Sequence, residues 1–210
     1  MSYARLMLAA CTAHPLPQSF VPLPPRHEVN PLIDWYFNTV FVLLPIFDET
    51  SFYTSVTAVY NADDRRPASP FDFWILRIVL AIASISRSEH RGDNSYVEAV
   101  GHMNAALKHA EDVLHPGSVE SIQALLVLFQ YATCDPHHLD AWTIIGAASR
   151  AMVDLGMHQD PPKPSAMPRA RTELRRRVYY CVYALDRCAS LLRRVALTKA
   201  HSIRDLDLQQ

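Results

Sequence analysis

The sequence predicts an all-α protein, a multi-helix bundle or array of about seven helices with no significant sheet. Apolar residues recur three and four positions apart along most of the chain, which is the period of an α-helix with one buried face. The 210 residues include 15 prolines but only 5 glycines, so helix ends are marked often and glycine-rich phosphate loops are nearly excluded. No stretch alternates between apolar and polar residues for more than a few positions, which disfavours strands.

Two parts are predicted along the chain: an extended, proline-rich lead-in over residues 1–25 and a helical domain over residues 26–210. Prolines are concentrated between Thr12 and Arg26, where the apolar residues show almost no periodicity. We expect the first helix to begin with Asn30 as its cap and Pro31 at its first position. Pro45 predicts the end of this helix, because proline disrupts a helix interior.

The later helices are predicted from caps, periodicity and stop signals. Pro70 suits the first position of an apolar helix, Ser118 suits a cap, and Gly156 suits a left-handed helix end. The prolines after Gly156 predict a loop, and Thr172 is the expected cap of the last long helix. After the first helix, the expected helices therefore span residues 49–60, 70–85, 95–114, 119–133, 139–155 and 172–193.

Composition narrows the classes of function. Half of the residues are hydrophobic and the formal net charge is −1, whereas a domain that grips nucleic acid with its own surface carries a basic excess. The four cysteines do not have the spacing of zinc ligands, so we expect no zinc in this chain. We also expect no other metal or cofactor and, from the net charge, no DNA contact. The longest apolar run, residues 71–85, contains two charges and is too short to span a bilayer, so no membrane contact is expected.

The helix predicted over residues 139–155 carries an unusual polar group. Trp142, Gly146 and Arg150 fall on one face, and the glycine suggests close approach of another helix. A guanidinium on a buried stripe needs a partner because its desolvation is costly. Asp186 also lies on an apolar stripe, so we predict that it pairs with Arg150 or Arg187. The alternative is a charged ligand bound between these two helices.

The segment after Gly156 holds a histidine and an acid two residues apart, His158 and Asp160. These side chains can serve as a metal pair, but the structural interpretation is preferred. In that interpretation His158 satisfies carbonyls at the helix end and Asp160 braces the following turn.

An arginine cluster opens the last predicted helix. Cations in the first turns of a helix oppose its macrodipole, so these arginines are expected to have acidic partners rather than to contact nucleic acid. The cluster includes Arg175, Arg176 and Arg177, and the nearest carboxylates belong to Glu173, Asp154 and Asp160.

Histidines leave a weaker alternative open, a helical metal-dependent enzyme. His102 and His109 lie seven residues apart on one helix face, and His137 and His138 precede an aspartate. A metal site would require these side chains to converge on one pocket. No serine–histidine–acid or cysteine–histidine set and no paired carboxylates stand out, so the sequence does not favour an enzyme.

The order of motifs between about Arg26 and Ser190 resembles the regulatory domain of fungal-specific transcription factors, the middle homology region of proteins whose DNA contact is made by a six-cysteine binuclear zinc cluster. Each motif is weak, but their order and spacing together are specific. The motifs that carry the resemblance are Trp142 with Gly146 and Ala148-Ser149-Arg150, Leu155-Gly156-Met157-His158-Gln159-Asp160, Glu173 with Arg175-Arg176-Arg177, Tyr179-Tyr180, and Tyr183-Ala184-Leu185-Asp186-Arg187.

The resemblance implies a nuclear, non-catalytic regulatory domain that controls transcription through contacts with other domains, transcription-machinery proteins or a small molecule. Homo- or heterodimers with relatives are also implied. No residue matches the zinc cluster, so zinc and DNA binding are expected of longer relatives, and the domain is expected to be truncated at its C-terminal side. The alternative function is a stand-alone interaction module that competes with full-length relatives for partners.

Overall fold

The structure is a computed structural model that describes residues 2–61, 66–159 and 167–207, with side chains as far as Arg193. These residues form nine α-helices and one π-helical segment, and their only β-type pairing is an isolated bridge between Thr12 and Leu139. The all-α prediction is therefore confirmed. In chain order the elements are α1 (Tyr3–Cys11), α2 (Arg26–Tyr36), η1 (Phe37–Phe41, the π-helical segment), α3 (Glu49–Tyr60), α4 (Pro70–Ile85), α5 (Asn94–Leu107), α6 (Ala110–Val113), α7 (Val119–Cys134), α8 (Ala141–Asp154) and α9 (Arg169–Asp207).

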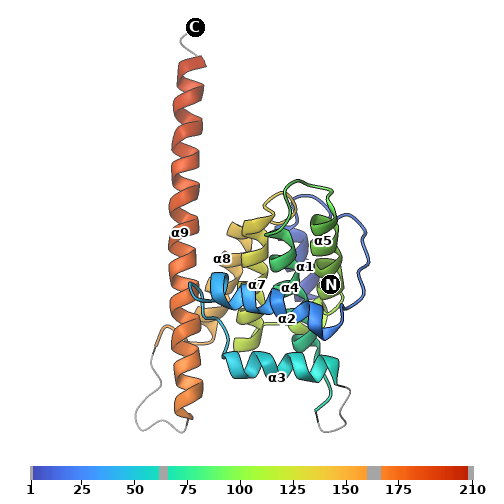
Figure 1. Cartoon of the computed structure of the whole chain (residues 1–210). Coiled ribbons are helices and arrows are strands. Elements are labelled where there is room, and N and C mark those ends of the chain that lie inside the picture. The colour runs from blue at the N-terminus through green and yellow to red at the C-terminus, as the bar shows by residue number, and fades with distance from the viewer. Residues whose placement is uncertain (1, 62–65, 160–166, 208–210) are drawn as a thin grey trace.

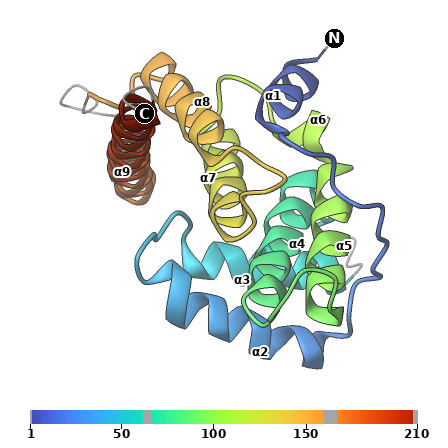
Figure 2. The ribbon, with the colours of Figure 1, turned by 90° about the horizontal axis from the view of Figure 1, so that it is seen from above.

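The helices are arranged around α4, which contacts α2, α3, α5, α6 and α7 (Figures 1 and 2). Helix α8 packs on α7, and α9 runs beside α8 on the side of the molecule away from α5. The C-terminal half of α9 extends past the other helices (Figure 1). Among the described residues, no helix combines the length and the apolar character needed to cross a bilayer.

Helix α4 is central because it is apolar on nearly all sides. Ser69 caps its first turn in a capping box with Asp72, and Pro70 occupies its first position. Trp74 is fully buried and its Nε1 donates to the carbonyl of Ala124 on α7 at 3.2 Å, so α4 and α7 are joined by a hydrogen bond inside the core. Burying each large side chain of this kind stabilises the fold by about 1.5–3 kcal/mol.

The predicted boundaries of three helices are wrong. Helix α2 begins at Arg26 instead of Asn30, so Pro31 lies inside the helix, close enough to the start that only one early hydrogen bond is lost. The predicted helix over residues 95–114 is interrupted before α6, where the His109 amide bonds to the Ala106 carbonyl three residues back and its ring stacks on Phe73. Helix α9 begins at Arg169, before the expected cap Thr172, and continues to Asp207 instead of ending near Arg193.

The first 25 residues differ in part from the predicted lead-in. Residues Tyr3–Cys11 form α1, which packs on α8 and α6, so an extended conformation is wrong there. Residues 15–25 have no regular secondary structure and run along the outside of α5 toward α2 (Figure 2). We call residues 13–25 the strap. Side chains of the helices donate hydrogen bonds to its carbonyl oxygens. Asn104 donates to the Pro17 carbonyl at 2.8 Å, and Arg77 donates to the Val21 carbonyl at 3.1 Å.

Candidate functional site

The predicted polar face of α8 is its outer face. Trp142 is 44% exposed and Arg150 is exposed, so the expectation of a buried guanidinium that needs a partner is wrong. Helix α8 instead buries its aliphatic stripe, which includes Ile144, Ile145 and Ala148. Both stripes have helical periodicity, and the larger apolar area of the isoleucine stripe decides which one faces the core.

Gly146 does not mark a close helix contact. A Cβ atom built on it would meet only the guanidinium of Arg150, at 3.7 Å, so no neighbouring helix requires a glycine there. The partner of this face is farther along the chain: the guanidinium of Arg193 on α9 lies 3.8 Å from the ring centre of Trp142. A cation placed over an indole ring contributes about 0.5–1 kcal/mol at an exposed site.

Gly156 ends α8 as predicted. Its φ of +62° is left-handed, its amide donates to Val153 at 2.9 Å, and the Met157 amide donates to Met152 at 3.0 Å. This pair of bonds is a Schellman motif, and Met152 and Met157 are both buried. The helix-end carbonyls of Met152 and Val153 are thus bonded by backbone amides, while His158 is exposed. Asp160 lies outside the described residues.

The arginines at the start of α9 bond to carbonyl oxygens of the chain. Arg175 donates to Leu155, at the end of α8, at 3.2 Å, and Arg177 donates to Phe47 at 3.4 Å. Among the described residues, neither guanidinium is paired with the predicted partners Glu173 or Asp154, and the third predicted partner, Asp160, lies outside these residues. A guanidinium suits the C-terminal end of a helix because unpaired carbonyls carry partial negative charge there. Arg176 is exposed and is also engaged in an interaction.

Asp186 pairs with Arg187, which confirms the predicted pairing with one of its two candidate partners. The Asp186 side chain is 18% exposed, whereas that of Arg187 is 61% exposed, so the pair lies at the edge of the protein and not in the core. Arg187 also lies over the ring of Tyr183 at 6.0 Å, and Tyr183 stacks on Tyr179 at 6.3 Å. Bonding to Asp186 raises the pKa of Arg187.

Of the four histidines of the metal hypothesis, His137 and His138 pack edge to face with ring centres 4.9 Å apart, whereas His102 and His109 have other contacts. His102 accepts a hydrogen bond from Arg77 at 2.9 Å, and His109 stacks on Phe73. His138 bonds to the hydroxyl of Tyr96, and His137 stacks on His14. In the described part of the chain, no group of three or more His, Cys, Asp or Glu side chains is placed to hold a metal ion. The metal-dependent enzyme therefore lacks the convergence that it requires.

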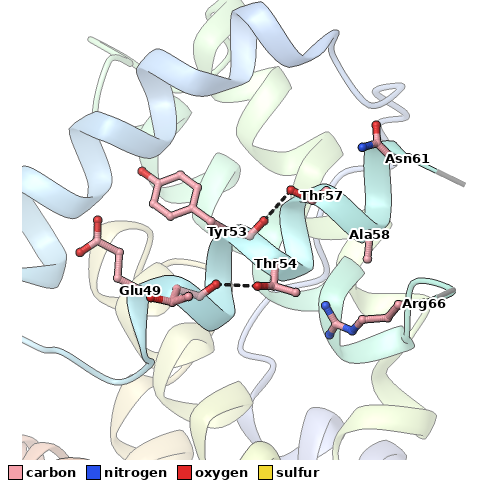
Figure 3. Close-up of a pocket in the computed structure, with 8 residues that line it drawn as sticks. Glu49, Tyr53, Thr54, Thr57, Ala58, Asn61 and Arg66 are labelled. Atoms are coloured by element: carbon pink, nitrogen blue, oxygen red, sulfur yellow. Dashed lines mark hydrogen bonds between the residues drawn. The ribbon is translucent and has the colours of Figure 1, made fainter. Parts of the chain in front are cut away.

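A surface groove of about 590 Å³ follows the outer face of α3 (Figure 3). Two of its hydroxyl groups are already used within the helix: Thr54 donates to the Thr50 carbonyl at 2.8 Å and Thr57 to the Tyr53 carbonyl at 2.9 Å. The remaining polar groups include Glu49 and Arg66, which lie at different ends of the groove. The groove is therefore a polar face of α3, and its described lining residues do not place a nucleophile beside a general base.

A larger cavity of about 930 Å³ lies where α3, α4, α7 and α9 begin. Arg175, one of the predicted site residues, lines it together with Arg66 and Asp72, whose side chains form an ion pair at 3.2 Å. Asp72 also accepts hydrogen bonds from Ser69, so its charge is already compensated. These three charged side chains thus bond to one another or to neighbouring elements of the fold.

A third cavity is an apolar groove of about 530 Å³ between η1, α4, α7, α8 and α9, and we call it the α7–α9 groove. It brings Trp142, a predicted site residue, together with residues that the sequence did not single out. Among them are Gln130 and the thiols of Cys134 and Cys188. Cys134 is exposed, but desolvation of its thiol by the surrounding helices raises its pKa, which keeps the thiol protonated at neutral pH. The sequence feature that could have indicated this groove is Gln130, a polar residue within the apolar run of α7.

Comparisons with known proteins agree with the motif order. A family model described as the fungal specific transcription factor domain matches residues 33–204. Similar proteins include the positive regulator of purine utilization of Emericella nidulans (24% identical; 80% of this chain and 21% of the relative). Sorbicillinoid biosynthetic cluster transcription factor 2 of Penicillium rubens is 30% identical, over 80% of this chain and 25% of the relative. The lactose regulatory protein LAC9 of Kluyveromyces lactis is 28% identical, over 75% of this chain and 17% of the relative.

The chain spans a quarter or less of the length of these relatives. No solved structure matches it. The family model nevertheless covers most of the chain, and the relatives are named as regulators of transcription. The chain therefore belongs to the fungal specific transcription factor domain family.

Proposed function

We propose that this chain is a non-catalytic regulatory domain that controls transcription in the nucleus through contacts with other protein segments. Its family and the names of its relatives support the class of transcription regulator. A net charge of −1 and the absence of zinc-ligand spacing in the sequence support placing zinc and DNA binding outside this chain.

The observation that carries the proposal is a row of exposed apolar side chains on α9. Tyr180, Tyr183 and Leu191 are 67%, 53% and 60% exposed and lie on successive turns of one helix face, with Arg187 between them. We call these four residues the α9 outer stripe. Large exposed apolar rows are uncommon on monomers, and tyrosine and arginine are enriched where proteins bind one another.

The outer stripe is partly ordered before any partner binds. Tyr183 is stacked on Tyr179, and Arg187 is held by both Tyr183 and Asp186. Side chains that are already positioned lose less conformational entropy on association. This arrangement suits an apolar helix face of another domain or of a partner protein.

The test replaces Tyr183 and Leu191 by serine in the gene at its natural locus. The matched control is Leu43→Ser, because Leu43 is 78% exposed but follows η1 and does not belong to the stripe. Transcript levels are compared with those of the wild type and of a deletion strain. We expect the stripe variant to reproduce the deletion and the control to behave as wild type, with all proteins equally abundant. Wild-type transcript levels in the stripe variant would refute the proposal.

A further inference from the structure

The α7–α9 groove has the size and lining of a small-molecule site. Its volume of about 530 Å³ falls within the range of roughly 300–1,000 Å³ that ligand pockets occupy. Its walls are formed by apolar side chains of four helices and of η1, among them Val40, Phe129, Trp142, Leu185 and Leu192. The groove therefore offers a ligand extensive apolar contact and few polar groups.

One polar group in this lining is buried without a partner. The Gln130 side chain is 4% exposed, and its Oε1 accepts a hydrogen bond from the buried hydroxyl of Tyr36 at 2.8 Å. Its Nε2 is buried and has no hydrogen-bond partner among the described residues. An amide nitrogen carries two donors, and leaving such a group unpaired costs about 1–3 kcal/mol.

Among the described residues, no other group around the groove is hydrogen-bonded to Nε2. The hydroxyl of Thr133, which also lines the groove, donates to the backbone carbonyl of Gln130 at 2.7 Å and does not reach Nε2 as an acceptor. The two thiols of the lining, Cys134 and Cys188, are weak acceptors. A water molecule needs two to four polar partners, and the mostly apolar lining supplies few of them.

We propose that the α7–α9 groove binds a small, largely apolar molecule that carries one hydrogen-bond acceptor, such as a carbonyl oxygen, and that the Gln130 amide, whose Nε2 is buried in the structure, turns toward the groove to donate to this acceptor. The apolar walls supply the contact area and the single amide fixes the orientation. The bound molecule would touch α7 and α9 at once and so stabilise the contact between them. This inference goes beyond the proposed function, because binding is measured without a partner protein.

The experiment uses a fluorescent ketone, 6-propionyl-2-dimethylaminonaphthalene, whose emission shifts to shorter wavelength in apolar surroundings. It is titrated into the 210-residue chain beside 2-dimethylaminonaphthalene, which lacks the carbonyl. We expect saturable one-site binding, with the ketone bound about fivefold more tightly, as one added hydrogen bond implies. Gln130→Leu should remove this difference and leave the affinity for the second compound unchanged.

A matched pair of variants on α9 locates the site. Ala189 lines the groove, so Ala189→Phe should fill it and weaken ketone binding more than tenfold. Ala184 is exposed and does not line the groove, so Ala184→Phe should change the affinity less than twofold. In the wild type, the bound ketone should slow alkylation of Cys134 and Cys188 by iodoacetamide, measured by mass spectrometry.

Three outcomes would overturn the inference: no saturable binding, equal weakening by the two phenylalanine variants, or equal affinity for the two compounds in the wild type. The last comparison needs no variant, so the inference can be refuted even if Gln130→Leu fails to fold. Circular dichroism shows which variants are folded. Since no partner protein is present, failure of this binding test leaves the proposed role of the α9 outer stripe standing.

Discussion

Val21 lies directly over Gly101: a Cβ atom built on this glycine would come within 2.3 Å of Val21 Cγ2. Gly101 is in the middle of α5, where alanine would favour the helix by about 1 kcal/mol. The glycine therefore has a packing role, since it allows the strap to approach the helix backbone. The strap is bound as an extended peptide would be, by side-chain donors that reach its carbonyl oxygens.

Gly101→Ala is expected to lower the free energy of unfolding by about 1–3 kcal/mol, because the clash with Val21 outweighs the gain in helix propensity. Urea unfolding followed by circular dichroism measures this change. The double variant Gly101→Ala, Val21→Gly should be less destabilised by the alanine than the single variant is, since the two clashing atoms, Val21 Cγ2 at 2.3 Å and Cβ at 2.8 Å, are then absent. If the single variant is more stable than the wild type, the strap does not pack on Gly101 as described.

His102 predicts a stability that depends on pH. Burial, aided by the positive charge of Arg77, lowers the pKa of His102 to about 4, whereas an unfolded histidine titrates near 6.5. Between these values the unfolded chain binds a proton that the folded chain does not. The contribution of His102 to the free energy of unfolding is therefore fully present above about pH 6.5. It decreases as the pH falls toward 4, by at most about 3 kcal/mol.

His102→Asn should flatten this dependence, because the amide oxygen of asparagine can replace Nδ1 as the acceptor for Arg77 and does not titrate. Urea unfolding at several values between pH 7 and pH 5 gives the slope. His158→Asn is the matched control, since His158 is exposed. Some slope should persist in the His102 variant, because burial also lowers the pKa of His109. An unchanged slope would show that His102 is not the responsible group.

Sequence reasoning located the helices well where local signals agree. The predicted bounds of α3 and α4 match the structure, because Pro45, Ser69 and Pro70 mark their surroundings and the apolar period is regular. It failed where two stripes compete for one core. On α8 the face of Trp142 and Arg150 has the same periodicity as the face of Ile144 and Ala148, and periodicity alone does not measure buried area.

The α7–α9 groove was harder to predict than the fold. Its lining comes from five elements spread between Val40 and Leu192, and no local pattern links them. Arg175 and Arg177 show the same limit, since they bond to backbone carbonyls at Leu155 and Phe47. Any residue type supplies such a carbonyl, so a search for acidic partners in the sequence could not find it.

Asp72→Ala is expected to lower the free energy of unfolding by about 2 kcal/mol. Asp72 is buried, accepts hydrogen bonds from the Ser69 amide and hydroxyl at 2.8 and 2.9 Å, and pairs with Arg66. The substitution removes the capping box of α4 and leaves its donors unpaired. Thermal unfolding of Asp154→Ala, at an exposed aspartate in the last turn of α8, gives the control. Equal effects of the two substitutions would contradict this role.

Two glycines of the predicted site should respond to alanine with opposite signs. Gly156 has a φ of +62° and open space around its Cβ position, so Gly156→Ala carries only the backbone cost of the left-handed conformation, about 1 kcal/mol. Gly146 lies inside α8 and its Cβ would meet only the flexible end of Arg150, so Gly146→Ala should stabilise the helix by up to about 1 kcal/mol. Urea unfolding of both variants decides the matter: destabilisation by Gly146→Ala would mean that a neighbouring helix approaches this position more closely than the structure shows.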